Sequence, residues 1–324
     1  MSFAAVVLIV GAGQLGSRYL QGLSACNVNL LIYVVDPNPN ALLVAQDRWN
    51  SVLHQVSTFK SVSFHISISE CPNQVDLAIV STTASKRYEV SCLLQQNIQI
   101  RYWILEKVLV QSSEELQKLS FVFGSDSRVW VNTPRRMLDW HKLIRANLIH
   151  ERPLHLLVTG KAWGLACNSI HFLDMFAWFT GEFLISISTH ELEKRWIQSK
   201  RQGFWEVIGT LEARFSGGST AIISVEDGNL SDLCYQFELY DSGFIWRIDE
   251  ANGIAVRSDG FIIPGRLPLQ SEVTPLLVDK ILRFGECDLP TLQVSSELHL
   301  VYLDAMLAHW QSTVDRAATR LPIT

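Results

Sequence analysis

The feature that most constrains the fold is a glycine-rich turn that directly follows an apolar run near the beginning of the chain. The run covers residues 4–10, and the turn reads Gly11-Ala12-Gly13-Gln14-Leu15-Gly16. In an α/β protein, this order predicts a buried strand, a tight turn and the first turn of a helix. Gly11 would permit the turn, Gly13 would let a ligand approach the backbone, and Gly16 would let the helix pack against the strand.

The residues after this turn favour a dinucleotide as the ligand. Residues 14–24 have helical spacing, and a second apolar strand, residues 29–35, ends at Asp36. A helix N-terminus offers N–H groups to a phosphate, and an acidic residue about 20 positions beyond the glycines accepts the ribose hydroxyls. The alternative is a glycine turn in an α/β protein without a nucleotide, in which Asp36 only caps the next helix. We expect the cofactor to be bound by Gly11, Gly13, Gln14, Leu15, Gly16 and Asp36.

Asp36 also indicates which dinucleotide is bound. Its carboxylate would repel the 2′-phosphate of NADP. Residues 36–39 contain no arginine or lysine that would attract this phosphate. The sequence therefore predicts NAD rather than NADP.

Length and composition indicate a globular protein of two domains. The 324 residues suffice for two domains of roughly 100–200 residues each, and 48% of them are hydrophobic against 18% charged. A formal net charge of −5 argues against a nucleic-acid surface. The sequence shows no secretion signal and no apolar run of about 18 residues, so we expect neither a membrane span nor a membrane partner. The six cysteines have no metal-ligand spacing, which indicates free thiols, a cytoplasmic protein and no metal site.

Residues 1–130 alternate strands with helices. Ser112, with Glu115 three residues later, has the pattern of a capping box at the start of one helix. Another helix is expected at residues 86–95, and apolar runs predict strands at 62–66, 75–80, 101–105 and 128–131. This alternation predicts a doubly wound, mainly parallel sheet with helices on both faces, that is, a Rossmann domain that binds NAD.

Residues 131–324 follow a different pattern, which predicts an α+β domain for substrate binding and oligomerisation. A strand is expected at residues 154–159, and helices are expected at 135–148, 169–179 and 294–313. From Val207 onward, strands separated by glycine turns predict an open, mainly antiparallel sheet. The turns are Ser216-Gly217-Gly218, Asp241-Ser242-Gly243, Ala251-Asn252-Gly253 and Ser258-Asp259-Gly260. The sheet face away from the helices is expected to carry Ile222, Phe237 and Ile245 and to contact a second subunit.

Two segments of the first domain could carry chemistry, because ligands of open α/β sheets bind at the carboxyl ends of strands. Ser81, Thr82 and Thr83 could line the nicotinamide ribose, or serve only as turn residues. Glu106 is expected beside the cofactor. The ammonium group of Lys107 could hold the reacting hydroxyl and stabilise the developing alkoxide, or lie on the surface.

The second domain offers a histidine on the helix predicted near residue 169. His171 and Asp174 lie three residues apart, so they share a helical face. Asn168 or Ser169 is expected to cap this helix. His171 could act as a general acid or base near neutral pH, although a lone histidine is more often structural. Asp174 could orient its ring or belong to a buried network.

Charged and polar residues of the second domain are candidates for substrate binding. Arg135 and Arg136 follow the predicted domain crossing, and such a pair could hold a phosphate or carboxylate. The alternative is a solvated helix start, since exposed arginines are common. We expect the substrate-binding residues to be Arg135, Asn168 and Asp174.

Together these motifs resemble the glucose–fructose oxidoreductase / inositol dehydrogenase (Gfo/Idh/MocA) family over nearly the whole chain. The family carries, in this order, G-x-G-x-x-G, T-P-x-x-x-H, E-K-P and a D-x-x-x-H-x-x-D helix, and the glycine motif is intact here. Residues 83–88 are similar to the second segment, with Ala84 for its proline and Tyr88 for its histidine. Residues 106–108 resemble the third segment without the proline, and residues 171–174 retain the H-x-x-D half of the last.

The resemblance implies a function, with one departure. Cys167 stands where the family has its first aspartate, and the neighbouring Asn168 can hydrogen-bond a sugar hydroxyl but cannot act as a base. The resemblance then implies His171 as the base and Lys107 as its catalytic partner. It implies an NAD-dependent oxidoreductase for a secondary alcohol or ketone of a sugar, sugar phosphate, nucleotide sugar or cyclitol. It also implies a homodimer or homotetramer formed through the C-terminal sheet.

Two other functions stay open at the level of the sequence. The first is redox-neutral chemistry, such as elimination or epimerisation through a transient ketone, with NAD used catalytically. The second is a non-catalytic, NAD-binding regulatory protein, which the residues Tyr88 and Cys167 would permit. The presence of Lys107 and His171 favours an enzyme over a regulatory protein.

Overall fold

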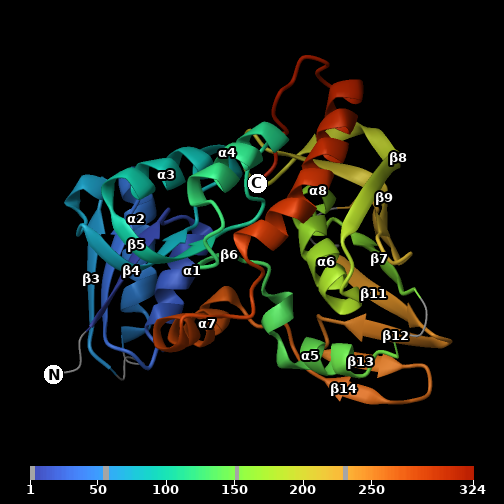
Figure 1. The fold of residues 1–324 in the computed structure, drawn as a ribbon, viewed down its shortest axis with the longest axis horizontal. Helices are drawn as coiled ribbons and strands as arrows, with labels where there is room; N and C mark the ends of the chain where they lie inside the picture. Colours follow the sequence, from blue (N-terminus) through green and yellow to red (C-terminus); the bar gives the residue numbers. More distant parts are fainter. Residues whose placement is uncertain (1–3, 54–57, 150–152, 229–232) are drawn as a thin grey trace. The chain divides into compact units, whose positions relative to one another are not determined.

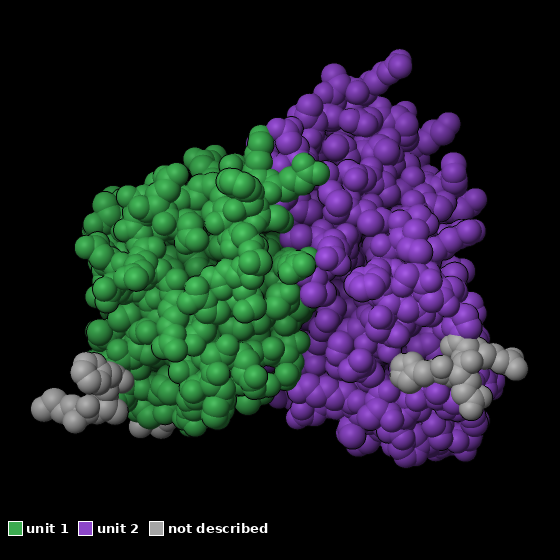
Figure 2. Space-filling view, in the orientation of Figure 1, with its two compact units in different colours: residues 1–110, 117–132, 268–293 green, residues 111–116, 133–267, 294–324 purple. Residues whose placement is uncertain are grey.

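Two separate β-sheets organise the chain, and each lies in its own unit. The computed structural model describes residues 4–53, 58–149, 153–228 and 233–324. Figure 2 colours the two units, of which unit 1 comprises Met1–Val110, Gln117–Asn132 and Pro268–Gln293. Unit 2 comprises Gln111–Leu116, Thr133–Leu267 and Val294–Thr324. The last segment of unit 1 returns from late in the sequence, which a single boundary at residue 130 does not anticipate.

Unit 1 contains a six-stranded parallel sheet in the order β3-β2-β1-β4-β5-β6. Its strands are β1 Ala5–Val10, β2 Leu30–Val35, β3 Lys60–His65, β4 Gln74–Val80, β5 Gln99–Leu105 and β6 Val129–Val131. The predicted strands are confirmed, with ends displaced by one or two residues. The central strands β1 and β4 are almost continuously apolar, because helices cover both faces of a parallel sheet.

Helices lie on both faces of this sheet (Figure 1). They include α1 Gln14–Leu23, α2 Pro39–Asn50, α3 Ala84–Asn97 and α7 Gln270–Phe284, with a short 3₁₀ helix, η2 Ile68–Glu70. Helices α1 and α7 pack closely, since a Cβ atom at Gly22 would lie 2.5 Å from the carbonyl oxygen of Ser271. The sequence analysis did not predict α7, which contains Pro275 in its interior. The doubly wound Rossmann fold of unit 1 is confirmed.

Helix α4, Ser113–Phe123, begins with half of the predicted capping box. The Oγ atom of Ser112 accepts the N–H of Glu115 at 3.2 Å, as predicted. The carboxylate of Glu115 accepts the N–H of Gln111 at 3.4 Å, which is one residue before the donor of a regular box.

Unit 2 contains an eight-stranded sheet in the order β14-β13-β12-β11-β7-β10-β9-β8. Its strands are β7 His155–Lys161, β8 Leu184–Gln198, β9 Trp205–Phe215, β10 Thr220–Val225, β11 Cys234–Asp241, β12 Phe244–Asp249, β13 Ile254–Arg257 and β14 Ile262–Pro264. The four predicted glycine turns join consecutive antiparallel strands from β9 to β14, except between β10 and β11. Strands β7 and β10 pair in parallel, so the sheet is mainly antiparallel, as expected.

Helix α6, Leu165–Thr180, packs against β9 and β10, and unit 2 also includes α8, Leu292–Thr313, over most of its length. The prediction for residues 135–148 is wrong, because a 3₁₀ helix, η3 Pro134–Met137, breaks at Leu138 before α5, Asp139–Ala146. In the part of the chain that the structure describes, no helix is long and apolar enough to cross a membrane.

The predicted outer face of the second sheet needs one correction. Phe237 is 1% exposed, because it pairs with Val158 and Ile248 on the buried face. Ile222 is 41% exposed, and Ile245 is half-buried. Two of the three apolar residues therefore remain available on the outer face.

Candidate functional site

The glycine turn of unit 1 joins β1 to α1 at the carboxyl end of the sheet. Gly11 has a φ of +98°, a left-handed conformation that favours glycine. A Cβ atom at Gly16 would lie 1.8 Å from the carbonyl oxygen of Gly11, so a side chain there would separate α1 from the turn. A Cβ atom at Gly13, just before Gln14 and Leu15 begin the helix, would meet nothing within 4 Å. The space beside Gly13 is therefore open at the start of α1, and a helix N-terminus is a site where a phosphate can bind.

Asp36 is joined to this turn from the end of β2. Its Oδ2 atom accepts the N–H of Ala12 at 2.7 Å, and its Oδ1 atom accepts the N–H of Asn38 at 2.9 Å. The cap of α2 is Asn38, whose side chain accepts the N–H of Asn40. Asp36 is thus not the cap of the following helix, and its carboxylate lies beside the glycine turn.

The hydroxyl residues after β4 lie at the same edge of the sheet. The Oγ atom of Ser81 donates to the carbonyl of Gly11 at 2.7 Å, so this residue supports the turn. Thr83 precedes the first residue of α3, and its hydroxyl lies 3.1 Å from that of Ser85. The Oγ1 atom of Thr82 is buried. Whether any of the three contacts a cofactor stays a prediction.

Glu106 and Lys107 follow β5 and lie in different surroundings. Glu106 is buried, and its Oε1 atom accepts the Tyr19 hydroxyl at 2.5 Å and the side-chain amide of Asn132 at 2.7 Å. Burial raises the pKa of Glu106, although these hydrogen bonds oppose the shift. Lys107 is half-buried. Glu106 thus anchors the backbone next to Lys107 from inside the unit.

Arg87 is a second anchor, which the sequence analysis did not identify. Its buried guanidinium donates to the carbonyl oxygens of Val108 and Thr82, and to that of Leu109 at 2.9 Å. These bonds tie the segment after Lys107 to the end of β4. The signal available in the sequence is a charged residue on the buried stripe of α3.

Helix α6 carries the predicted histidine in unit 2. The predicted cap is wrong, because α6 begins after Gly164, and Asn168 and Ser169 lie within the helix. The Asn168 amide donates to the carbonyl of Trp163 at 2.7 Å, and the Ser169 hydroxyl donates to a carbonyl four residues earlier. His171 lies in the second turn and is half-buried.

Asp174 belongs to a buried ion pair within unit 2. Its Oδ1 and Oδ2 atoms accept the guanidinium of Arg136 at 2.7 and 2.8 Å, and Oδ2 also accepts the Thr133 hydroxyl at 2.9 Å. The sequence left open whether Asp174 orients the ring of His171 or belongs to a buried network. Its contacts with Arg136 and Thr133 are those of a buried network. These contacts attach η3 to α6.

Arg135 lies in a second buried network. Its guanidinium forms two hydrogen bonds with Glu250, at 2.8 and 2.6 Å, and lies 4.4 Å from the ring centroid of Phe172. The Tyr235 hydroxyl also donates to Glu250 at 2.7 Å, and His141 lies 3.3 Å from it. Although burial opposes it, the charge of Arg135 holds the pKa of Glu250 well below its ordinary value. Arg135 is thus not the solvated helix start that the sequence left open.

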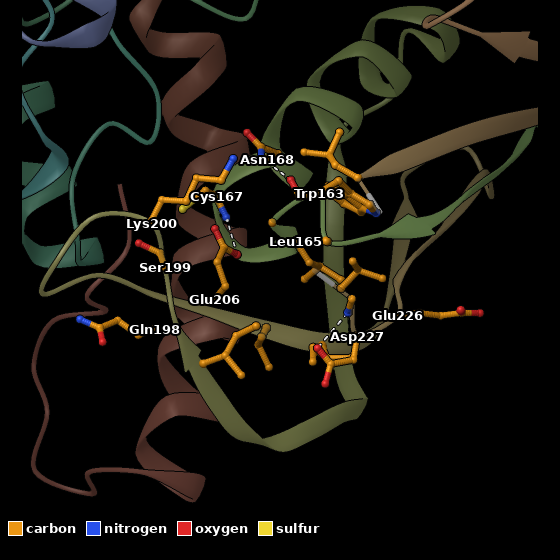
Figure 3. A pocket seen from close by; sticks show the side chains of 18 of the residues that line it. Trp163, Leu165, Cys167, Asn168, Gln198, Ser199, Lys200, Glu206, Glu226 and Asp227 are labelled. Atoms are coloured by element: carbon orange, nitrogen blue, oxygen red, sulfur yellow. Dashed lines mark hydrogen bonds between the residues drawn. The ribbon is translucent and has the colours of Figure 1, made fainter. Parts of the chain in front are cut away.

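Unit 2 contains a pocket of about 550 Å³ at the start of α6. Figure 3 shows Cys167 and Asn168 from α6, Lys200 from the β8–β9 connection and Glu206 from β9 around this pocket. The Oε2 atom of Glu206 accepts the N–H of Ala166 at 2.7 Å and lies 3.4 Å from the N–H of Cys167. The sequence analysis missed Glu206, and no local motif marks it. Among the described residues, no cluster of His, Cys, Asp or Glu is suited to a metal ion.

The comparisons define the class of fold first. A parallel six-stranded sheet combined with a mainly antiparallel eight-stranded sheet is the fold of Gfo/Idh/MocA-type dehydrogenases, and solved structures match this chain over nearly its whole length. No protein-family model and no curated protein matches the sequence.

Three of the similar structures are named dehydrogenases. UDP-N-acetylglucosamine 3-dehydrogenase from Acidithiobacillus ferrooxidans is 14% identical, with a TM-score of 0.66 and 97% of this chain and 98% of that chain covered. Myo-inositol dehydrogenase from Lactobacillus casei, in complex with NAD(H) and myo-inositol, is 13% identical, with a TM-score of 0.69 and 96% of both chains covered. Levoglucosan dehydrogenase, in complex with NADH and L-sorbose, is 14% identical, with a TM-score of 0.69 and 95% and 97% covered. At these identities the likeness shows the fold.

Proposed function

We propose that this protein is an NAD-dependent oxidoreductase that acts on a secondary alcohol, or the corresponding ketone, of a sugar or cyclitol. The observation that carries the proposal is the glycine turn with open space at Gly13 and the Asp36 carboxylate bonded to its backbone. These groups suit a pyrophosphate and a ribose diol, respectively. The similar structures that hold NAD(H) or NADH support the cofactor, and their names support the substrate class.

The fit to NAD rests on this chain's own residues. The first turn of α1, with Gln14 and Leu15, offers N–H groups and the positive end of the helix dipole to phosphate oxygens. Asp36 would accept the hydroxyls of the adenosine ribose, and its negative charge would disfavour the 2′-phosphate of NADP. When bound, NAD supplies the acceptor for a hydride.

Lys107 and His171 are the proposed catalytic residues. The Lys107 ammonium would donate a hydrogen bond to the substrate oxygen and stabilise negative charge on it. The His171 imidazole would take the hydroxyl proton during oxidation and return it during reduction. Glu106 and Arg87 would position Lys107 by fixing the backbone on either side of it.

The pocket at the start of α6 in unit 2 would bind the substrate. Asn168 lines this pocket and is retained as a substrate-binding residue. Arg135 and Asp174 are not retained, because buried partners already take up their charged groups. The proposal therefore assigns these two residues to holding α6 and η3 in place.

The test is formation of NADH, measured by absorbance, with a panel of neutral and phosphorylated sugars and cyclitols. We expect at least one neutral polyol to reduce NAD. Lys107→Ala should bind NAD with unchanged affinity and lose turnover, because its side chain acts on the substrate oxygen. Full activity in Lys107→Ala would refute the mechanism, and NAD binding without turnover of any compound would favour a regulatory protein.

A further inference from the structure

The first turn of α1 lies against a guanidinium group from another helix, which the proposed function does not use. We propose that Arg48, on α2, is a positioning residue of the dinucleotide site, which fixes the first turn of α1 and places a positive charge there for the cofactor's diphosphate. The identity of the ligand rests on the proposed function. Arg48 would act on the affinity for the cofactor and take no part in hydride transfer.

Arg48 contacts the start of α1 through three hydrogen bonds. Its Nη1 atom donates to the carbonyl oxygen of Gln14 at 3.0 Å and to the hydroxyl of Ser17, and its Nη2 atom donates to the Oε1 atom of Gln14 at 2.5 Å. Gln14 is the first residue of α1, directly after Gly13. The guanidinium is therefore held beside the turn that would receive the diphosphate.

The positive charge of Arg48 has no negative partner in the part of the chain that the structure describes. All of its hydrogen-bond acceptors are neutral, and it forms no ion pair with a described residue. Partial burial, and after it the charge of Arg18, lower the pKa of Arg48, so its surroundings disfavour the charge. Arginine nevertheless stays protonated in proteins. An anion beside α1 would supply the missing negative charge.

The helix start adds to this excess of positive charge. The described residues of α1 include no acid in the first turn, and the N-cap, Gly13, has no side chain to accept an N–H group. Helix α4 has the ordinary arrangement, with Glu114 and Glu115 in its first turn. A guanidinium at the positive end of a helix dipole is unfavourable in the ligand-free protein and becomes favourable when an anion binds.

The charged groups around the turn suit different parts of a dinucleotide. The Asp36 carboxylate, which accepts the N–H of Ala12, would repel a phosphate and accept ribose hydroxyls. The first turn of α1, with Arg48 against it, would attract a phosphate, and the space beside Gly13 is open. The diphosphate carries the negative charge of the ligand and the ribose carries the hydroxyl donors. We therefore expect Arg48 to act on the diphosphate.

The experiment measures the binding of NAD, ADP and adenosine to the full chain by titration calorimetry. Arg48→Gln removes the charge and keeps a hydrogen-bond donor for Gln14, whereas Arg48→Lys keeps the charge. The matched control is Arg101→Gln, which removes the same charge from an exposed position in the amino-terminal half of β5. The glycine turn, in contrast, lies at the carboxyl end of the sheet.

We expect Arg48→Gln to weaken the binding of NAD and ADP about fivefold or more at low ionic strength, and about 1 M salt to reduce the difference by screening the charge. Arg48→Lys and Arg101→Gln should bind both ligands within about twofold of the wild type. Adenosine, which has no phosphate, should not distinguish the variants. A smaller loss in Arg48→Gln, or an equal loss in Arg101→Gln, would overturn the proposal.

The melting temperature of the ligand-free protein separates this role from a merely structural one. Because Arg48→Gln relieves repulsion at the start of α1, its melting temperature should equal or exceed that of the wild type. A lower melting temperature, or a variant that does not fold, would show that Arg48 serves the stability of α1 and would overturn the proposal.

The outcome distinguishes this inference from the proposed function. ADP binding that depends on Arg48, without NADH formation from any polyol, would refute the oxidoreductase and support the role of Arg48. NADH formation with an unchanged affinity for NAD in Arg48→Gln would support the oxidoreductase and refute that role. A wild type that binds neither NAD nor ADP would refute both.

Discussion

At the residue scale, the Asp36 carboxylate is fixed by the N–H groups of Ala12 and Asn38 before any ligand arrives. Asp36→Asn keeps one oxygen that can accept the N–H of Ala12. It removes the negative charge that would strengthen the hydrogen bonds from the ribose hydroxyls and repel a 2′-phosphate. We expect NAD affinity to fall about tenfold, because a hydrogen bond to a charged group contributes about 1.5–3 kcal/mol. NADP affinity should rise in the same variant. Calorimetry with NAD and with NADP measures the ratio of the two affinities. The control is Asp47→Asn, which removes an exposed negative charge on α2.

Glu106 gives a prediction for the dependence of stability on pH. Because burial raises its pKa, the folded state binds more protons than the unfolded state between the two pKa values. The free energy of unfolding should therefore fall as pH rises from the unfolded pKa, about 4.3, to the folded one. Glu106→Gln keeps an acceptor for Tyr19 and removes this loss, so the variant should gain stability over wild type as pH rises. Urea unfolding from pH 4.5 to 8 tests this.

The control for that experiment is Glu89→Gln, which removes an exposed carboxylate of α3. Its difference in stability from wild type is the reference over the same pH range. A pH dependence of Glu106→Gln no larger than that of this control would contradict the account of Glu106 as a buried carboxyl.

At the element scale, two glycines of the β1–α1 turn should respond differently to alanine. A methyl group at Gly16 would meet the Gly11 carbonyl at 1.8 Å, so the turn must distort, at about 1–3 kcal/mol or more. Gly16→Ala should therefore lower the melting temperature. Gly13 has a φ of −60° and no neighbour within 4 Å of the added methyl group. Gly13→Ala should fold normally and lose NAD affinity, and a Gly13→Ala variant that binds NAD like wild type would contradict the assigned phosphate site.

Besides the Arg136–Asp174 pair, the ion pair between Arg135 and Glu250 attaches η3 to the rest of unit 2. Both side chains are buried, so Glu250→Gln leaves the arginine charge without its partner. We expect Glu250→Gln to lower the free energy of unfolding by about 3–5 kcal/mol. Glu226→Gln breaks an exposed pair with Lys161 and should change it by about 1 kcal/mol or less. Urea unfolding measures the free energy of unfolding of both variants. Equal losses would show that burial does not determine how much each ion pair contributes to stability.

At the scale of the whole molecule, much of the fold could be predicted from local patterns. The glycine turn, the alternating elements of unit 1 and the glycine-turn meander of unit 2 are short-range signals. Two elements lack such a signal. Strand β8, Leu184–Gln198, is mostly exposed, and its short apolar alternation at residues 185–188 gives way to a segment rich in charged residues. Helix α7 contains Pro275, and its place beside α1 depends on Gly22, far away in sequence.

The candidate site was predictable where one segment supplies it, and not where distant segments meet. The start of α6 shows why. A polar cap was expected at Asn168 or Ser169, but Glu206, about 40 residues later, accepts the N–H groups of the first turn. The helix therefore begins four residues before Ser169. The carboxylate of Glu206 lies beside Cys167, although no acidic residue adjoins Cys167 in the sequence. Partners such as Glu206 come from tertiary structure, which a local motif does not encode.

The central claim is that this chain moves a hydride between a polyol and NAD. The most direct test incubates the purified protein with NAD and a polyol deuterated at its hydroxyl-bearing carbons, and follows the C4 position of the nicotinamide by NMR. The account predicts deuterium at C4 with the wild type and none with Lys107→Ala, although both bind NAD. Bound NAD and bound polyol without any transfer of deuterium in the wild type would contradict it.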